Sequence, residues 1–179
     1  MPGLILVTGG SRSGKSAFAQ QLAEAIPGPR IFLATCPRTD SEMEERIRRH
    51  REDRKGRGWQ SIEVEIDLVS HLADIPPATT VLIDCLTLWI NNLMYAARRE
   101  NRELTEDGLA GHADRLAGAA HTHDGTVILV TNEVGLGIVP DNPLARRYRD
   151  LVGRCNQVVA ARADQVFLVT CGIAQQIKG

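Results

Sequence analysis

The chain has 179 residues, of which 43% are hydrophobic and 24% are charged, and its formal net charge is −1 at pH 7. These values are ordinary for a soluble globular protein, so we expect residues 1–179 to form a single domain. A net charge so close to zero creates no global field that would attract nucleic acid or an anionic membrane. No apolar run reaches the ~20 residues that a membrane-spanning helix requires. We therefore expect no nucleic-acid partner and no membrane span.

The four cysteines, Cys36, Cys85, Cys155 and Cys171, are widely separated and show no C-x-x-C spacing. This distribution favours reduced thiols over a disulfide framework or a zinc site. The N-terminus leads directly into an apolar segment without the pattern of a signal peptide. We therefore expect a cytoplasmic protein.

The strongest motif follows the first apolar run, residues 4–7, which is long enough for one buried strand. The next residues are Gly9-Gly-Ser-Arg-Ser-Gly14-Lys15-Ser16, a full match to the phosphate-binding loop. Glycines allow such a loop to turn its N–H groups towards phosphate oxygens, and a helix that begins near Gly14 directs its positive end at the same anion. Lys15 is predicted to reach the β and γ phosphates, and the Ser16 hydroxyl to ligate Mg²⁺.

The surroundings of the motif agree with this interpretation. A helix after the loop would place Phe18, Leu22 and Ile26 at i, i+4 and i+8 on one apolar face. The alternative is a glycine-rich turn that matches by chance, but a strand before the loop and a helix after it favour nucleotide binding. The motif indicates a nucleoside triphosphate, and it specifies neither the base nor the reaction.

Apolar runs and helical patterns alternate along the rest of the chain. The apolar runs predict further strands at 30–35, 61–66, 79–84, 126–131 and 165–170. Apolar spacing and capping signals predict helices at 67–73, 86–99, 100–121 and 143–162. The sequence Ser41-Glu-Met-Glu44 has the form of a capping box, so we expect a further helix that ends before Gly56.

Short apolar strands that alternate with helices predict an α/β fold of the P-loop NTPase type. Its sheet is expected to be mostly parallel, with helices on both faces, as in RecA-like proteins. In such a fold the ligand binds at the carboxyl ends of the strands. Residues that follow strands are therefore the first candidates for chemistry.

Asp84 ends the predicted strand that contains Val81-Leu-Ile-Asp84. A carboxylate at this place in a phosphate-loop protein is suited to hold Mg²⁺, directly or through water. Its alternative role is to cap the helix that is predicted from Leu86. We favour the metal role because the strand must lie in the same sheet as the phosphate-binding loop.

A basic stretch, RIRRHREDRK, occupies residues 46–55. On a helix, Arg46, His50 and Arg54 would form one row at i, i+4 and i+8. Guanidinium groups suit a triphosphate, and a neutral histidine among them is able to attack phosphorus and form a phosphoramidate. Spacing alone nevertheless favours a solvated basic face.

Two further segments have alternative roles. Residues 130–140, VTNEVGLGIVP, follow a strand and contain two glycines. Glu133 in this loop is equally suited to contact substrate and, with Asn132, to satisfy backbone groups. The predicted helix 143–162 carries several arginines, for which a solvated face or a subunit contact is favoured over phosphate binding.

Several blocks of the sequence, in this order, resemble a known family. They are the loop 9–16, the block R-I-x-x-H-R-E-D-R at 46–54, the block D-C-L-T-L-W-I-x-N at 84–92, and residues 130–140. A tail with R-D-L-x-G-R-x-N-Q at 149–157 and C-G-I at 171–173 follows. Over nearly the whole chain the sequence closely resembles the bifunctional adenosylcobinamide kinase / adenosylcobinamide-phosphate guanylyltransferases of cobalamin biosynthesis. The blocks at 46–54 and 131–140 are the most specific of these.

The resemblance implies two reactions. In the first, ATP or GTP phosphorylates the hydroxyl of the aminopropanol arm of adenosylcobinamide. In the second, GTP guanylylates a histidine of the enzyme with release of pyrophosphate, and GMP passes to adenosylcobinamide phosphate to give adenosylcobinamide-GDP. By the family pattern His50 is the guanylylated residue, which reverses the interpretation from spacing alone. The resemblance also implies a homotrimer.

The resemblance further implies which residues line the nucleotide site. They are Gly9, Gly10, Ser11, Arg12, Ser13, Gly14, Lys15, Ser16, Ala34, Thr35, Cys36, Arg51, Glu52, Asp53, Arg54, Glu63 and Asp84, with Ser16 and Asp84 as ligands of Mg²⁺.

Cations near His50 would favour the neutral imidazole that a nucleophile requires. The chain departs from the family between Arg54 and Trp59, where Lys55-Gly-Arg-Gly58 stands in place of a proline and a short path to the tryptophan.

Two alternatives compete with the bifunctional enzyme. A single-activity kinase of the same fold would lack the guanylyl step, yet the sequence retains His50. A nucleotide-dependent switch or binding module without a small-molecule substrate would be expected to contain a guanine-reading N-K-x-D motif, and the sequence has none.

Overall fold

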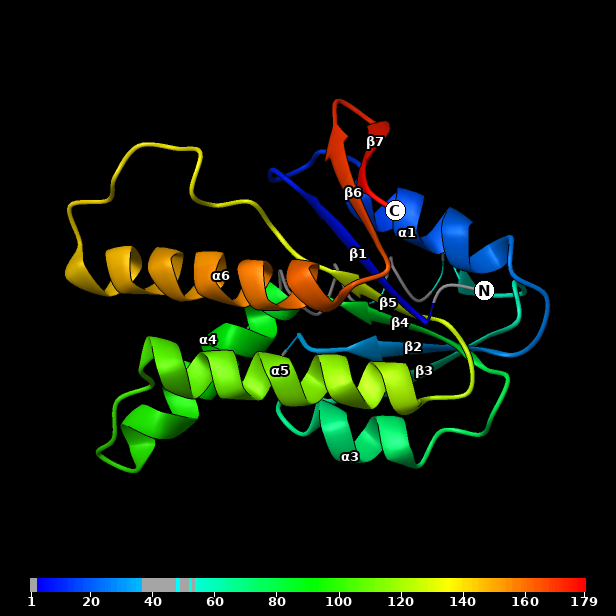
Figure 1. The fold of residues 1–179 in the computed structure, drawn as a ribbon, viewed down its shortest axis with the longest axis horizontal. Helices are drawn as coiled ribbons and strands as arrows, with labels where there is room; N and C mark the ends of the chain where they lie inside the picture. The colour runs from blue at the N-terminus through cyan, green and yellow to red at the C-terminus, as the bar shows by residue number, and fades with distance from the viewer. Residues whose placement is uncertain (1–2, 37–47, 49–51, 53) are drawn as a thin grey trace.

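The computed structural model describes residues 3–36, 48, 52 and 54–179. A seven-stranded sheet runs through the molecule in the order β3-β2-β4-β5-β1-β6-β7 (Figure 1). The strands are β1 (Leu4–Gly9), β2 (Arg30–Ala34), β3 (Trp59–Glu63), β4 (Thr80–Asp84), β5 (Val127–Val130), β6 (Gln165–Thr170) and β7 (Ile173–Lys178). All neighbouring pairs are parallel except β6 and β7, which form an antiparallel hairpin.

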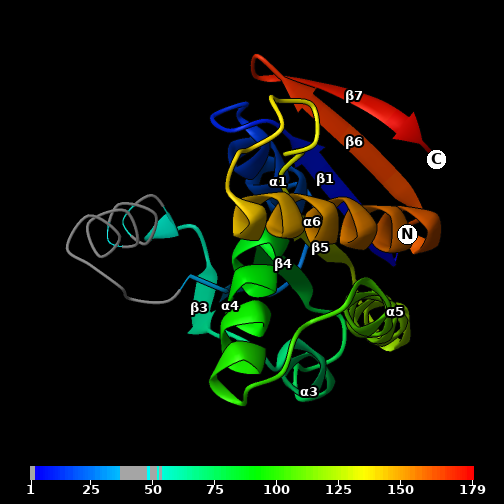
Figure 2. The same cartoon turned by 90° about the vertical axis from the view of Figure 1, so that its left-hand side faces the viewer.

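Helices cover both faces of this sheet. They are α1 (Lys15–Glu24), α3 (Leu68–Ala73), α4 (Leu86–Arg99), α5 (Glu106–Thr122) and α6 (Pro143–Arg162). Figures 1 and 2 show α1 on one face and the other four helices on the opposite face. The predicted α/β fold with a mostly parallel sheet is therefore confirmed. No helix in the described part of the chain is long and apolar enough to cross a membrane.

The alternation of side chains along β1 explains how both faces are buried. Leu4 and Leu6 belong to the apolar cluster beneath α3, α4, α5 and α6, whereas Ile5 and Val7 belong to the cluster beneath α1. All four side chains are at most 1% exposed. Central strands that are buried on both faces have continuous apolar sequences, which is why the sequence predicted them well.

The predicted apolar face of α1 is only partly correct. Its fully buried side chains are Ala19 and Ala23, and Phe18 and Leu22 pack at the side of the same cluster. Ile26 lies beyond the end of the helix, since α1 ends at Glu24. The two alanines allow the helix to approach the sheet closely, so they occupy the central row in place of the larger side chains.

Two predicted boundaries were wrong, and a third lies outside the described residues. The strand predicted at 61–66 is β3 (Trp59–Glu63), because it pairs in parallel with all five residues of β2. The helix predicted from residue 100 begins at Glu106, because the Thr105 hydroxyl accepts a hydrogen bond from Gly108 N and caps a new helix there. The capping box at 41–44 lies outside the described residues, and of its predicted helix only Arg48, Glu52 and Arg54 are described, as helical.

The strand β7 was not predicted. Cys171 and Gly172 connect it to β6, and both have positive φ angles, 53° and 79°, as in a two-residue type I′ hairpin turn. Because β7 is an edge strand with mostly exposed side chains, its sequence lacks a clear apolar run. All four cysteines are free thiols, as expected from their spacing.

Candidate active site

The loop between β1 and α1 depends on two glycines. A Cβ at Gly9 would lie 2.3 Å from Val169 O and 2.7 Å from Ser13 Oγ, so no side chain fits there. Gly14 caps α1 with a φ of 93°, and a Cβ on it would lie 3.1 Å from Gly172 Cα. The loop is therefore compact, and the N-terminus of α1 opens at the carboxyl edge of the sheet, where an anion binds favourably.

Both strands next to β1 support this loop. On the β6 side, Gly172 N donates a hydrogen bond to Ser13 O at 2.8 Å. On the β5 side, Glu133 N donates to Gly9 O at 3.0 Å. Sequence reasoning missed the contribution of the β6–β7 hairpin, because Cys171-Gly172 is not one of the usual hairpin dipeptides and residues 173–178 show no clear apolar run.

Lys15 is buried in the loop, with 8% of its surface exposed. Its Nζ donates to Gly10 O at 3.0 Å. Burial lowers the pKa of Lys15, and the Asp84 carboxylate partly opposes this by raising the pKa. The ammonium group from the loop and the carboxylate from the end of β4 thus act on each other in one site.

Strand register aligns Asp84 with the ends of two further strands. Ala34 on β2 pairs with Asp84 on one side and with Glu63 on the other, so the three residues form one row across the sheet. Residues in register on parallel strands point to the same face, and Ala34 packs in the cluster beneath α1. Asp84 and Glu63 therefore project from the face that carries the phosphate-binding loop.

Arg54 packs on the same face of the sheet. Its guanidinium carbon lies 3.6 Å from the centre of the Phe32 ring, and the residue is only 6% exposed. Phe32 precedes Ala34 by two residues on β2, so its ring points to the same face as the row of Asp84 and Glu63. This cation–π contact fixes Arg54 next to the strands that carry the two acids.

Thr35 has a structural contact where the resemblance implied a nucleotide contact. The residue is fully buried, and its hydroxyl donates to Cys85 O at 2.7 Å and accepts from Cys85 N at 2.8 Å. Asn92 Nδ2 donates to Thr35 O at 2.8 Å. The side chain therefore joins the ends of β2 and β4, while its neighbours Ala34 and Cys36 are partly exposed.

The polar residues after β5 bind their neighbours in the protein. Asn132 Nδ2 donates to Thr87 Oγ1 at 3.1 Å, and Asn132 O accepts from Asn156 Nδ2 at 3.0 Å. The Glu133 carboxylate accepts from Gly135 N at 3.3 Å. Of the two roles left open by the sequence, Glu133 has the structural one, because it accepts from a backbone N–H of the loop, whereas the Asn132 side chain bonds a hydroxyl of α4. Sequence reasoning assigned no role to Thr87 or Asn156, because their partners lie far away along the chain.

Two arginines of α6, Arg146 and Arg162, have partners within the protein. Arg146 Nη1 donates to Pro140 O and Asp141 O at 2.9 and 2.7 Å, and Arg162 pairs with Asp114 at 2.5 Å. These contacts agree with the favoured interpretation of a solvated face for Arg146 and Arg162.

On the α1 face, the structure places the loop 9–16 within electrostatic range of Asp84, whereas Ala34, Arg54 and Glu63 lie further along the same face towards the edge strand β3. Glu52 lies apart on the surface, where it pairs with Arg48 at 2.7 Å. His50, Arg51 and Asp53 lie outside the described residues.

Comparison with known proteins decides the family. Residues 5–177 match the family model described as cobinamide kinase / cobinamide phosphate guanyltransferase. The chain belongs to this family. A relative from Salmonella typhimurium, named bifunctional adenosylcobalamin biosynthesis protein CobU, is 40% identical over 182 residues, which cover 98% of this chain and 99% of the relative. The CobP protein of Pseudomonas aeruginosa, with the same description, is 35% identical over 97% of this chain and 96% of its own length.

Membership of the cobinamide kinase / cobinamide phosphate guanyltransferase family confirms the resemblance seen in the sequence. The family description names both activities, which supports the bifunctional enzyme over the single-activity kinase. Among solved structures, a KaiC-like protein from Pyrococcus horikoshii OT3 is similar with a TM-score of 0.48 and 18% identity, covering 93% of this chain and 71% of the other.

Proposed function

We propose that this enzyme first transfers the γ phosphate of ATP or GTP to the hydroxyl of adenosylcobinamide. It then transfers GMP from GTP, through His50, to adenosylcobinamide phosphate and forms adenosylcobinamide-GDP. The observation that supports this proposal is the interaction of Lys15 of the phosphate-binding loop with Asp84 at the end of β4. Both reactions require a triphosphate held at such a place.

The residues of the loop suit a nucleoside triphosphate with Mg²⁺. Ser13 Oγ is buried and has no hydrogen-bond partner in the part of the chain that the structure describes. Its hydroxyl can therefore donate a hydrogen bond to an anion bound at the loop. Ser16, in the first turn of α1, and Asp84 supply the oxygen ligands that Mg²⁺ prefers. When bound there, Mg²⁺ neutralises charge on the phosphates. The rest of the proposed nucleotide site is lined by the other loop residues and by Ala34, Cys36 and Glu63.

The guanylyl transfer proceeds by two displacements. An imidazole nitrogen of His50 attacks the α phosphorus of GTP, the bond to the bridging oxygen breaks, and pyrophosphate leaves. A phosphate oxygen of adenosylcobinamide phosphate then attacks the same phosphorus, and the N–P electrons return to the imidazole. Arg51 and Arg54, which follow His50 closely in the sequence, would offset charge on the departing pyrophosphate.

We also propose that the enzyme is a cytoplasmic homotrimer of single-domain chains. Leu136 and Ile138, in the loop after β5, are 85% and 95% exposed. Large apolar side chains exposed next to each other mark interaction surfaces, which supports a contact between subunits.

The products of three purified proteins test the two-step function. With adenosylcobinamide, GTP and Mg²⁺, we expect the wild type to form adenosylcobinamide-GDP, detected by mass spectrometry. The His50→Ala variant should stop at adenosylcobinamide phosphate, and Lys15→Ala should form neither product because it loses the phosphate anchor. A folded wild type that never phosphorylates the corrinoid would contradict the proposal.

A further inference from the structure

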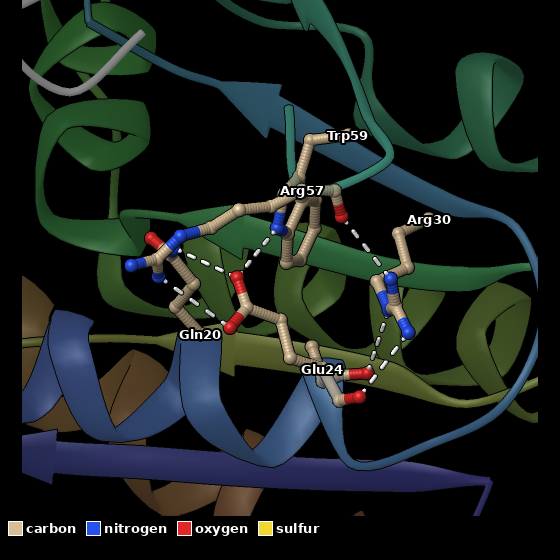
Figure 3. A network of polar contacts seen from close by, with 6 residues as sticks. Gln20, Glu24, Arg30, Arg57 and Trp59 are labelled. Carbon is tan, nitrogen blue, oxygen red and sulfur yellow. Dashed lines mark hydrogen bonds and ion pairs between the residues drawn. The ribbon is translucent and has the colours of Figure 1, made fainter. Parts of the chain in front are cut away.

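A polar network lies at the end of α1 that is opposite the phosphate-binding loop (Figure 3). Its centre is the Glu24 carboxylate, whose Oε1 accepts hydrogen bonds from Trp59 Nε1 and Gln20 Nε2, both at 2.9 Å. The other oxygen, Oε2, lies 3.5 Å from Arg57 Nη1. A single carboxylate thus joins the last turn of α1 to residues that lead into β3.

Arg30 strengthens the same junction. Its Nε donates to Ala23 O at 3.2 Å and its Nη2 to Glu24 O at 3.1 Å, so it caps two carbonyls at the C-terminus of α1. Its Nη1 donates to Arg57 O at 3.2 Å. Arg57 is therefore held at both its side chain, by Glu24, and its backbone, by Arg30.

The network fixes the path by which the chain leaves the basic segment. Arg54, four residues after His50, is anchored on Phe32, and Arg57 N donates to Arg54 O at 3.2 Å. Gly56 and Gly58 turn the chain with φ angles of 78° and 75°. The segment that departs from the family pattern is thus tied down by Arg57, one of its own residues.

We propose that Glu24 is a positioning residue for the guanylyl step. It holds Trp59 and Arg57 against the C-terminal end of α1, whose N-terminal end begins with Lys15 of the phosphate-binding loop. The one helix therefore connects the nucleotide to the end of the segment that carries His50. This inference rests on the proposed role of His50, since the kinase step uses the loop and not the histidine.

The electrostatics of the network agree with this role. The hydrogen bond from Trp59 is the largest cause that lowers the pKa of Glu24, and Gln20 and Arg57 lower it further against the opposing effect of burial. The carboxylate therefore remains ionised at neutral pH and keeps its three partners.

Separate rates for the two reactions test the inference. The guanylyl rate is followed as label from α-³²P GTP retained on denatured protein, and the kinase rate as phosphate transferred to adenosylcobinamide. For Glu24→Ala we expect the guanylyl rate to fall about tenfold and the kinase rate to change less than about twofold, because misplacement of a reacting group penalises only its own step. Glu24→Gln should recover most of the guanylyl rate, since its amide oxygen still accepts from Trp59.

Further variants separate positioning from folding. Trp59→Phe removes the Nε1–H donor and the five-membered ring but keeps an aromatic ring near Phe32, so it should slow the guanylyl step selectively. The double variant Glu24→Ala/Trp59→Phe should be no slower than Glu24→Ala, because the two residues act through one hydrogen bond. Asp114→Asn, which breaks an exposed ion pair with Arg162 at 2.5 Å, is the matched control and should alter neither rate.

The outcomes distinguish this inference from the proposed function. The positioning role would be overturned if Glu24→Ala took label as fast as the wild type. It would also be overturned if Glu24→Ala lost the guanylyl and kinase rates in parallel. A wild type that takes no label would overturn the proposed guanylyl step itself, and the role of Glu24 with it. Melting temperature and GTP affinity, measured on each variant, show whether a parallel loss comes from unfolding.

Discussion

Gly9 shows how closely single residues determine the site. Its Cα faces Val169 O on β6, so even the smallest side chain would clash with backbone. The neighbouring Gly10 has no atom within 4 Å of a Cβ position. A side chain would therefore fit at Gly10 but not at Gly9, and the motif alone does not distinguish these two adjacent glycines.

We expect Gly9→Ala to lower the free energy of unfolding by about 1–3 kcal/mol, because the backbone must shift to accommodate the methyl group. The same shift should weaken GTP binding. Urea denaturation and a binding titration check both effects, with Gly10→Ala as the control that should unfold like the wild type. Equal stability of the two variants would contradict this account of the loop.

Thr35 yields a second prediction for a single residue. Thr35→Val keeps the shape of the side chain but removes the hydroxyl that bonds Cys85 N and Cys85 O. We expect a loss of about 1–3 kcal/mol in unfolding free energy, since a buried N–H loses its partner. Thr122→Val, where the hydroxyl is exposed, should cost about 0.5 kcal/mol or less in the same denaturation experiment. A Thr35→Val loss no larger than that control would refute the structural role.

Asp164 connects elements, since it lies between α6 and β6 and binds the start of β1. Its carboxylate accepts hydrogen bonds from Gly3 N and Leu4 N, both at 2.8 Å. The bond from Leu4, foremost, lowers the pKa of Asp164 below its ordinary value. A carboxyl whose folded-state pKa is lowered stabilises the protein above its unfolded-state pKa, and this contribution is lost as the pH falls through the folded-state pKa.

We therefore expect Asp164→Asn to be less stable than the wild type at pH 7, by about 0.5–1 kcal/mol because solvent screens this exposed group. The difference should shrink as the pH falls below 3.8, the ordinary pKa of an aspartate, and through the lowered pKa of the folded protein. Urea denaturation of both proteins across this pH range measures the difference. A gap that is unchanged between pH 7 and pH 3 would show that ionisation of Asp164 is not its cause.

The elements also show how far sequence reasoning reaches. Strands such as β1 and β4 are buried on both faces, so their apolar runs predicted them directly. The edge strands β3 and β7 bury little, and β7 has the sequence Ile-Ala-Gln-Gln-Ile-Lys, in which no apolar run is visible. The start of α5 depended on one hydrogen bond from Gly108 to Thr105, which the apolar pattern does not reveal.

The candidate site likewise contains residues that the local sequence predicts and residues that it does not. The phosphate-binding loop and Asp84 were predictable because a local motif and the end of an apolar strand identify them. The row of Asp84, Ala34 and Glu63 and the support of the loop by Gly172 depend on long-range strand pairing, which spacing does not determine. The role of His50 came from the resemblance, since spacing alone favoured a solvated face.

At the scale of the whole molecule, the proposed assembly has a direct test. We expect sedimentation equilibrium to give a species of three times the 19.6 kDa chain mass at the concentrations used for activity assays. A fully active monomer at those concentrations would refute the homotrimer. Substitution of Leu136 by Asp should lower the mass if the exposed loop lies between subunits, because burial of a charge there is unfavourable.

The measurement that tests the central claim most directly is covalent labelling. Wild type and His50→Ala are incubated with Mg²⁺ and α-³²P GTP, denatured, and examined for retained label. The bifunctional account predicts label on the wild type that is stable to base and labile to acid, as a phosphoramidate is, and no label on the variant. A folded wild type that binds GTP without taking label would contradict the guanylyl step, and label that persists on His50→Ala would assign the nucleophile to another residue.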